Sequence, residues 1–227
     1  MKNSISYTEG ASFLTTEPAQ TAEAKPWESH ITAGRGWAYG SEILLQKKTG
    51  RFSGWAGYTL SWTWWQFPAL NGGVKFHPRY DRRHDASLVG LYELKPGITL
   101  SGTWVYGTGQ ALTVPLAEYA SGPHQPNRTR FNNIIIHSPT VSDYSAKNSF
   151  RAEPYHRMDF GIQFHKKKRH HERTWEFSVY NLYNRRNPFF YNLETKSGNA
   201  PGQPSTTVLK RYSVFPVVPS FSYNFKF

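Results

Sequence analysis

Two clusters of charged residues contain side chains that could bind a metal ion or an anion. The first combines imidazoles with a dense run of cations: His165, Lys166, Lys167, Lys168, Arg169, His170, His171 and Arg173. This concentration of positive charge opposes cation binding, so a hydrated turn is a better interpretation than a metal site. The sequence therefore predicts no metal ion, and no motif in it calls for a cofactor.

The second cluster mixes both signs of charge, and consists of Arg79, Asp81, Arg82, His84 and Asp85. Guanidinium groups could hold an anionic ligand, and a carboxylate beside an imidazole could hold a metal ion. A ladder of ion pairs on a polar wall explains the same mixture more simply. Within this cluster the candidate ligand contacts are Arg79, Asp81 and Arg82.

Motifs for enzymatic chemistry are missing. The chain contains no G-x-S-x-G, no glycine-rich phosphate loop and no H-E-x-x-H, and it has no cysteine to act as nucleophile. Asp and Glu together number only 15, with no evident pair on a common face. We therefore expect a protein that is not an enzyme.

Composition indicates an unusual environment for the aromatic rings. Aromatic residues make up 16% of the chain, although only 38% is hydrophobic and the mean hydropathy is -0.63. No apolar run approaches the roughly 18 residues of a membrane-spanning helix. Strands of a transmembrane barrel need apolar residues only at every second position, so such a barrel remains compatible with this composition.

The net charge of +12 predicts an anionic partner, which could be nucleic acid, lipopolysaccharide phosphate or an acidic ligand. The absence of cysteine fits a protein of the bacterial envelope. Residues 1–14 show no apolar segment typical of a secretory signal, so we expect the chain to be a fragment.

Hydrophobicity alternates with a period of two along much of the chain, which is typical of strands with two different faces. In residues 55–65, apolar Ala56, Tyr58 and Leu60 alternate with small or polar neighbours. The last residues repeat the pattern, with Phe221, Tyr223, Phe225 and Phe227 on one face.

We expect an all-β, antiparallel sheet of about seven strands. Their predicted ranges are 36–48, 55–69, 83–95, 98–112, 156–167, 173–191 and 208–227. Short turns and long connections alternate between these strands, which is typical of an outer-membrane barrel with its short turns on the periplasmic side. Residues 1–30 lack periodicity and are expected to be an extracellular loop remnant or a disordered end, followed by the barrel section 31–227.

The final stretch, Ser213-Val-Phe-Pro-Val-Val-Pro-Ser-Phe-Ser-Tyr-Asn-Phe-Lys-Phe227, resembles the closing strand of TonB-dependent outer-membrane transporters, especially Bacteroidetes-like ones. Further segments are similar to the same family in order and spacing: Gly36–Glu42, Tyr58–Ser61, Arg79–His84, Gly97–Gly102, Tyr180–Asn184 and Asn187–Tyr191.

The resemblance implies a barrel of about 22 strands plugged by an amino-terminal domain. Such a receptor imports a siderophore, glycan or similar ligand with energy transmitted through TonB. This chain would supply the closing strands and outer loops in the bacterial outer membrane. Its expected partners are outer-membrane lipid, lipopolysaccharide, the barrel-assembly machinery, and the missing amino-terminal plug and strands through which TonB would act.

Two sets of residues are expected to serve these roles. The long connection 113–155 is the expected outer contact with ligand. Aromatic residues at alternate positions of the final strand resemble the barrel-assembly signal: Phe221, Tyr223, Phe225 and Phe227. The expected ligand contacts of the long connection are Arg128, Arg130, Asn132, Asn133 and Tyr144.

The alternative is a soluble β-rich module that binds polysaccharide or single-stranded nucleic acid through rings and basic residues. A nucleic-acid binder would concentrate Lys and Arg between rings on one sheet face. Here the basic residues gather in turns and loops, so we predict no nucleic-acid partner.

Overall fold

The computed structural model describes residues 2–8, 27–115, 117–120, 125–128, 134–137, 140–144, 146–196 and 206–227. These residues form an all-β structure in which the strands pair antiparallel and no α-helix occurs. The expected all-β, antiparallel class is therefore confirmed. No helix of the described part is long and apolar enough to cross a membrane.

Contacts divide the chain into two compact units. Unit 1 consists of Met1–Ala38, Thr63–Asp81 and Ala111–Arg151, and unit 2 of Tyr39–Trp62, Arg82–Gln110 and Ala152–Phe227. The two units are described separately below.

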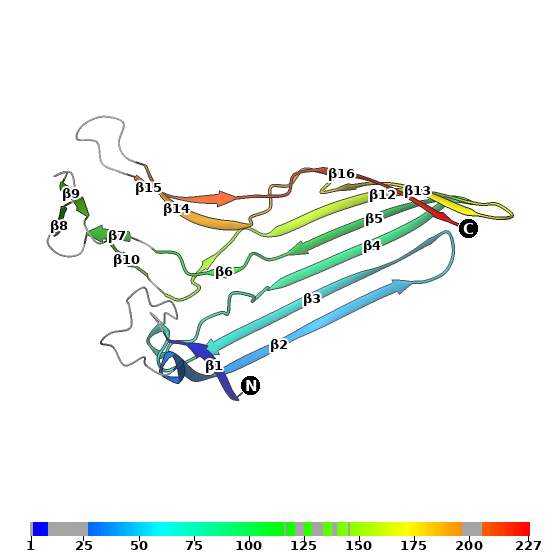
Figure 1. Cartoon of the computed structure of the whole chain (residues 1–227). Coiled ribbons are helices and arrows are strands. Elements are labelled where there is room, and N and C mark those ends of the chain that lie inside the picture. The colour runs from blue at the N-terminus through cyan, green and yellow to red at the C-terminus, as the bar shows by residue number, and fades with distance from the viewer. Residues whose placement is uncertain are drawn as a thin grey trace. The chain divides into compact units, whose positions relative to one another are not determined.

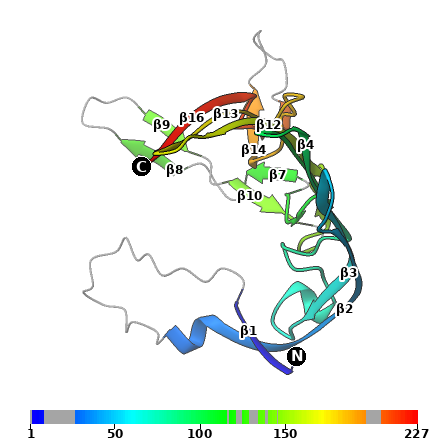
Figure 2. The same cartoon turned by 90° about the vertical axis from the view of Figure 1, so that its right-hand side faces the viewer.

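The largest sheet has eight strands in the order β1-β2-β3-β4-β5-β12-β13-β16. In unit 2 the strands from β4 to β13 lie side by side in Figure 1, and Figure 2 shows β12, β13 and β16 in one layer. Their bounds are β1 Lys2–Tyr7, β2 Ile31–Lys47, β3 Phe52–Gln66, β4 His84–Lys95, β5 Ile98–Gly107, β12 Tyr155–Lys167, β13 Glu172–Tyr180 and β16 Val218–Lys226.

Smaller elements lie in the connections. Four two-stranded sheets pair β6 with β11, β7 with β10, β8 with β9, and β14 with β15. Their bounds are β6 Ala111–Leu112, β7 Ala117–Ala120, β8 Gln125–Arg128, β9 Ile134–His137, β10 Thr140–Asp143, β11 Phe150–Arg151, β14 Phe190–Lys196 and β15 Thr206–Tyr212, with 3-10 turns η1 Trp27–His30 and η2 Asn71–Gly73.

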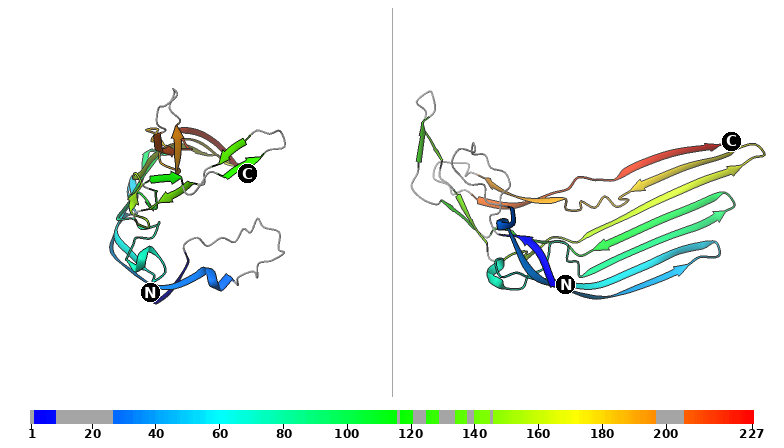
Figure 3. Two further views of the ribbon diagram at one scale, coloured as in Figure 1. Left: turned by 90° about the vertical axis from the view of Figure 1, so that its left-hand side faces the viewer. Right: turned by 60° about the horizontal axis from the view of Figure 1, so that its bottom comes forward.

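The predicted alternation of connection lengths is confirmed. From β2 onward, residues 48–51, 96–97 and 168–171 make short turns, whereas the longer segments 67–83, 108–154 and 181–217 join the other consecutive strands of the large sheet. The right-hand view of Figure 3 shows the three short turns and the carboxy-terminus at the same end of the long strands. Antiparallel pairing requires this, because successive hairpins return the chain to the same edge.

The predicted strand 173–191 is interrupted. Strand β13 ends at Tyr180, and the chain then turns through Asn181 and Asn184, which both have left-handed backbones with φ 56° and 54°. The buried Asn181 side chain holds this turn, because its amide donates to the carbonyls of Arg185 and Phe215. Asparagine tolerates the left-handed region, which explains why the strand ends here.

The other end strands also differ from prediction. The range 208–227 contains two strands, because β15 ends at Tyr212 and pairs with β14, whereas β16 begins at Val218 and pairs with β13. Near the amino end, β1 pairs with β2 from Tyr7 opposite Ile31 to Lys2 opposite Arg35. Backbone pairing orders β1, although its sequence has no clear period.

Unit 1 contains a small apolar core. Phe67 and Leu70 are fully buried and Phe76 is nearly so, with Trp65 packed against them. A bridge between Trp65 and Phe76 folds the connection back on β3. Phe67 lies within the predicted strand 55–69, but the strand β3 ends at Gln66 and the returning connection covers the Phe67 ring.

The described strands form no closed barrel, so the expectation that residues 31–227 are a section of a larger transmembrane barrel stays a prediction. Strands β1 and β16 stand at the two edges of the strand order, and no pairing joins them within the described residues. The structure therefore shows an antiparallel sheet with two free edges.

Candidate functional site: two contrasting faces of the sheet

The paired strands of unit 2 place apolar side chains on one face. Register sets Leu88 opposite Trp104, Trp104 opposite Met158, and Ile162 opposite Phe177. Because alternate residues of a strand point to the same face, the face extends over six strands. Its members are Phe52, Ala56, Tyr58, Leu60, Leu88, Tyr92, Leu100, Trp104, Tyr106, Met158, Phe160, Ile162, Phe164, Trp175, Phe177, Val179, Phe221, Tyr223 and Phe225.

Rings from neighbouring strands touch one another across this face. The ring centroids of Trp175 and Tyr223 lie 4.3 Å apart, and those of Phe177 and Phe221 lie 5.0 Å apart. Phe164 meets Phe177 edge to face at 6.3 Å. Such cross-strand pairs stabilise the sheet and fix its register.

The apolar face is exposed rather than packed into a core. Phe177 is 47% exposed and Phe221 is 55% exposed, whereas Leu100, Trp104 and Ile162 are half-buried, and no member of the face is buried. All the large buried apolar side chains of the described residues, Phe67, Leu70 and Phe76, belong to unit 1. A soluble protein rarely exposes such a contiguous apolar patch.

A shallow hollow of about 620 Å³ interrupts the apolar face. Gly90 stands opposite both Gly54 and Gly102, so three adjacent strands lack a side chain at one level. The rings of Phe52 and Trp104 and the side chain of Leu88 are among the groups that line the hollow. The missing side chains therefore explain the depression.

The opposite face of the same strands is polar. Trp55, Val89, Leu91 and Val105 are exceptions to its polar character, and the ring of Trp55 covers Gly57. Charged side chains appear on the apolar face only toward its ends. The residues of the polar face include Ser53, Thr59, Asp85, Ser87, Thr99, Ser101, Thr103, Arg157, Asp159, Gln163, Thr174, Glu176, Ser178, Ser220, Ser222 and Asn224.

A network of polar groups fixes the long-connection end of this face. Arg157 forms an ion pair with Asp159 at 2.9 Å and donates hydrogen bonds to the hydroxyls of Tyr155 and Tyr180. Asp159 also accepts the backbone N–H of Asn181. These bonds connect β12, β13 and the turn after β13, so the polar groups of this corner satisfy one another.

The charged cluster around Asp81 is an internal network of unit 1. The Asp81 carboxylate is buried, accepts the backbone N–H of Thr63 at 2.8 Å and pairs with Arg151 at 2.8 Å. His77 lies 3.4 Å from it and donates through Nδ1 to the Thr63 carbonyl. Asp81 is therefore a buried residue that links the connection after β3 to strand β3 and to Arg151 of β11.

The remaining expected ligand contacts are spread over the chain. Arg82 pairs with Asp85 at 3.2 Å, Arg79 and Tyr144 are exposed, and Arg128 ends strand β8. Arg130, Asn132 and Asn133 lie outside the described residues. Arg151 and Asn181 are structurally central but were missed, because their partners are distant in sequence.

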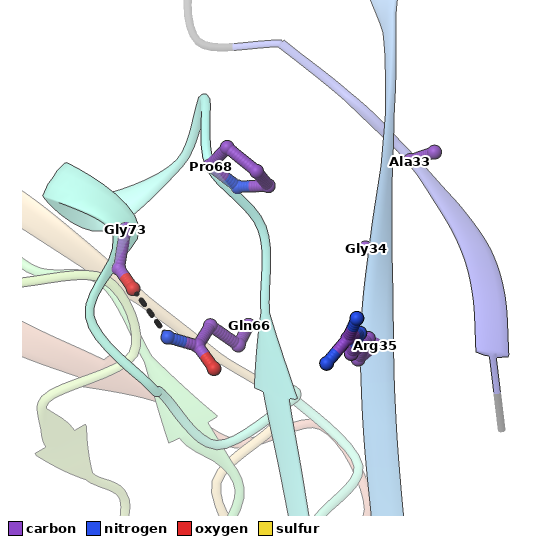
Figure 4. A pocket seen from close by; sticks show the side chains of 6 residues that line it. All are labelled: Ala33, Gly34, Arg35, Gln66, Pro68 and Gly73. Atoms are coloured by element: carbon purple, nitrogen blue, oxygen red, sulfur yellow. Dashed lines mark hydrogen bonds between the residues drawn. The ribbon is translucent and has the colours of Figure 1, made fainter.

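A separate hollow in unit 1, of about 490 Å³, lies where β2 meets the connection after β3. Figure 4 shows it lined by Ala33, Gly34, Arg35, Gln66, Pro68 and Gly73, with the Gln66 amide donating to the Gly73 carbonyl at 2.9 Å. A Cβ at Gly34 would lie 2.3 Å from Phe67 Cδ1, so the close approach requires glycine.

One tyrosine and one lysine outside the long strands have pKa values that differ from their usual values in solution. Partial burial raises the pKa of Tyr80 in the connection after β3. In the β14–β15 hairpin, Lys210 donates to Glu194 at 3.0 Å, and this bond raises the pKa of Lys210. Both groups keep their usual protonation at neutral pH.

The histidine-rich turn has the composition expected of a hydrated turn. His170, Lys168 and Arg169 are exposed, and Lys167 pairs with Glu172 at 2.9 Å. Among the residues that the structure describes, no group of three or more His, Asp or Glu side chains is placed to hold a metal ion.

Three of the expected assembly residues lie on β16 and Phe227 follows its last residue; within the described residues, β16 pairs only with β13. Phe221, Tyr223 and Phe225 share the apolar face, and Phe227 is 97% exposed. An extended edge strand with alternating rings has the form that a partner can recognise by strand addition.

Comparison with known protein families, with characterised proteins and with solved structures finds no match. The functional argument therefore depends on the two faces, the connections and the motifs themselves.

Proposed function

We propose that this chain forms the closing section of a β-barrel receptor in the bacterial outer membrane, of the TonB-dependent type. The exposed apolar face over six strands is the observation that carries the proposal. Lipid would cover this face, and the polar face would line the water-filled interior. An outer-membrane barrel has this distribution of side chains.

Strand length supports membrane insertion. Crossing a bilayer takes about 9 to 11 residues of a tilted strand. Strands β4, β5 and β12 have 12, 10 and 13 residues, and β13 and β16 have 9 each. The alternation of short turns and long connections also fits periplasmic turns opposite outer loops.

The free edges support a role as part of a larger sheet. An unpaired strand edge in lipid is costly, because each unsatisfied backbone group costs several kcal/mol. In the proposal, other strands of a receptor pair with these edges, and an amino-terminal plug with TonB gives that receptor its transport activity. The imported ligand would be a siderophore, glycan or similar molecule.

The long connections would form the outer, ligand-facing side. Arg79, Arg82, Arg128, Arg130 and Tyr144 stay candidate contacts there, as do Asn132 and Asn133. Asp81 would act indirectly, by tying the connection after β3 to Arg151.

The soluble binding module is the competing function. Its rings would have to bind polysaccharide or nucleic acid in water. The middle of the apolar face has no Lys or Arg between its rings, which disfavours nucleic acid.

Single cysteines test the proposal, because the natural chain has none. Ile162→Cys on the apolar face and the adjacent Gln163→Cys on the polar face form a matched pair. The full chain, refolded with phospholipid vesicles, is treated with a charged, water-soluble maleimide. We expect Gln163→Cys to react and Ile162→Cys to react only after detergent is added.

A second pair, Leu100→Cys and Ser101→Cys, repeats the comparison on β5. Equal labelling of both members of each pair, in a chain that remains soluble beside the vesicles, would establish the soluble module instead.

The assembly role is tested separately by Phe227→Ser in cells that export the chain. We expect a lower yield in the outer-membrane fraction because the terminal ring is lost. Phe215→Ser, an exposed ring outside β16, is the control. An unchanged yield for Phe227→Ser would remove the assembly role.

A further inference from the structure

Basic residues border the short-turn end of unit 2. Contacts connect the turns to one another: the N–H of Glu93 donates to the Arg51 carbonyl, and the N–H of His165 donates to that of Gly97. Glu93 and Glu172 are the only acidic side chains in turn segments 46–52, 93–97, 165–173 and 222–227. The cations of these segments are Lys47, Lys48, Arg51, Lys95, Lys166, Lys167, Lys168, Arg169, Arg173 and Lys226.

Several basic groups lie against rings at the border of the apolar face. Lys47 Nζ is 5.8 Å from the Phe52 ring centroid, and the Arg51 guanidinium carbon is 5.5 Å from that of Tyr92. The rings of His171 and Phe225 have centroids 5.2 Å apart. Phe52, Tyr92 and Phe225 all belong to the apolar face, so the charge begins where that face ends.

The β12–β13 turn is shaped to leave cations free for a partner. The Lys168 N–H donates to the His171 carbonyl at 2.8 Å, which closes the turn. Glu172, the acidic residue of the turn, forms its ion pair with Lys167. Lys168 and Arg169 are exposed and make no ion pair within the described residues. A hollow of about 200 Å³ lies between this turn and Lys226 and Phe227.

We infer that the short-turn end binds the phosphate groups of anionic phospholipids, with Lys168 and Arg169 as principal contacts. The inference rests on the proposed membrane location of the apolar face. A phospholipid presents its phosphate directly beside its acyl chains, which matches a row of cations directly beside an apolar face. Basic side chains near an anionic lipid surface strengthen binding, and salt weakens that attraction.

This position favours lipid over free phosphate or nucleic acid. A free phosphate needs no apolar neighbour. A single strand of nucleic acid needs rings and cations along its path, whereas here the rings lie on one side of the cation row. Adjacent apolar and basic zones fit one partner, a lipid layer with acidic headgroups.

Vesicle flotation with the full chain tests the inference. One set of vesicles is pure phosphatidylcholine, and the other also contains phosphatidylglycerol. We expect the natural chain to bind the acidic vesicles at least about tenfold more tightly, with the difference shrinking in high salt. The variant Lys168→Gln/Arg169→Gln should lose most of that difference.

Lys75→Gln/Arg186→Gln is the matched control, because it removes the same charge from two exposed positions elsewhere. It should keep the preference for acidic vesicles. Equal loss in both variants would mean that only net charge matters, and would overturn the assignment to the β12–β13 turn. A further set of flotation experiments contains inorganic phosphate. Complete loss of binding to the acidic vesicles at millimolar phosphate would overturn the lipid as the source of the bound phosphate.

The two proposals fail in different ways. Equal binding of the natural chain to both kinds of vesicle overturns the phospholipid inference and leaves the membrane location intact. No binding to either kind overturns both.

Discussion

The two units place their apolar side chains in opposite ways. In unit 1 Phe67, Leu70 and Phe76 lie inside, as in a protein folded in water. In unit 2 the rings cover an exposed face, and the polar groups of β12 and β13 bond to one another on the other side. One chain therefore contains a part whose apolar side chains are buried and a part whose apolar side chains remain partly or fully exposed.

The two units are also stabilised by different kinds of interaction. Unit 1 depends on buried contacts between segments distant in sequence, such as the pair of Asp81 and Arg151. The sheet of unit 2 depends on backbone pairing and on ring contacts between adjacent strands. Substitutions of the same kind should accordingly have different effects in the two units.

The largest effect is expected for Phe67→Ala. Removing a fully buried ring should destabilise unit 1 by about 4 kcal/mol, because it leaves a cavity beside Leu70 and Phe76. Phe177→Ala removes an exposed ring and should cost less than about 1.5 kcal/mol. Hydrogen exchange in each unit measures both losses. Equal losses would show that the two rings have equivalent surroundings and would break the comparison.

Asp81→Asn should destabilise unit 1 by about 3 kcal/mol. The substitution replaces a buried carboxylate with a neutral amide, so the Arg151 guanidinium loses the negative charge that it pairs with. Limited proteolysis should then cleave the connection after β3 sooner, with the β12–β13 hairpin unchanged. Combining it with Arg151→Ala should add little, since both changes break one pair. Fully additive losses would contradict this account of the pair.

A charge on the apolar face should hinder insertion. Ile162→Lys should disfavour the membrane by about 2 kcal/mol, which corresponds to about 30-fold in partition between vesicles and water. Gln163→Lys, one residue along the same strand, should leave partition unchanged because its side chain faces the polar side. If the two variants behaved alike, the faces would not differ in their exposure to lipid.

The smallest effect is expected for Arg82→Ala. Arg82 and Asp85 are 40% and 45% exposed, and a pair so open to water contributes no more than about 0.5 kcal/mol. Chemical unfolding measures the change beside Asp81→Asn. A loss as large as that of the buried pair would mean that exposure does not decide the strength of these ion pairs.

The local pattern predicted the sheet well. A period of two in the sequence predicts a strand with two faces wherever it occurs, so β4, β5 and β12 lie within two residues of their expected starts. The spacing between the predicted strands likewise separated short turns such as 96–97 from long connections. These features depend on residues that are close together in the chain.

The local sequence pattern could not predict contacts between residues that are distant in the sequence. The predicted strand 55–69 includes Phe67, yet a returning connection buries its ring. Asp81 meets Arg151 across 70 residues, and β1 pairs with β2 across the segment that separates them in the sequence. The break after Tyr180 depends on the buried amide of Asn181, whose bonds reach Phe215.

The sequence by itself determined the strands β4, β5 and β12, their two faces and the alternation of short and long connections, since each follows from neighbouring residues. Only the tertiary structure decided which rings are buried and which charges are paired. Burial and pairing are properties of segments that meet in space, and their free energies depend on excluding water between partners distant in the sequence.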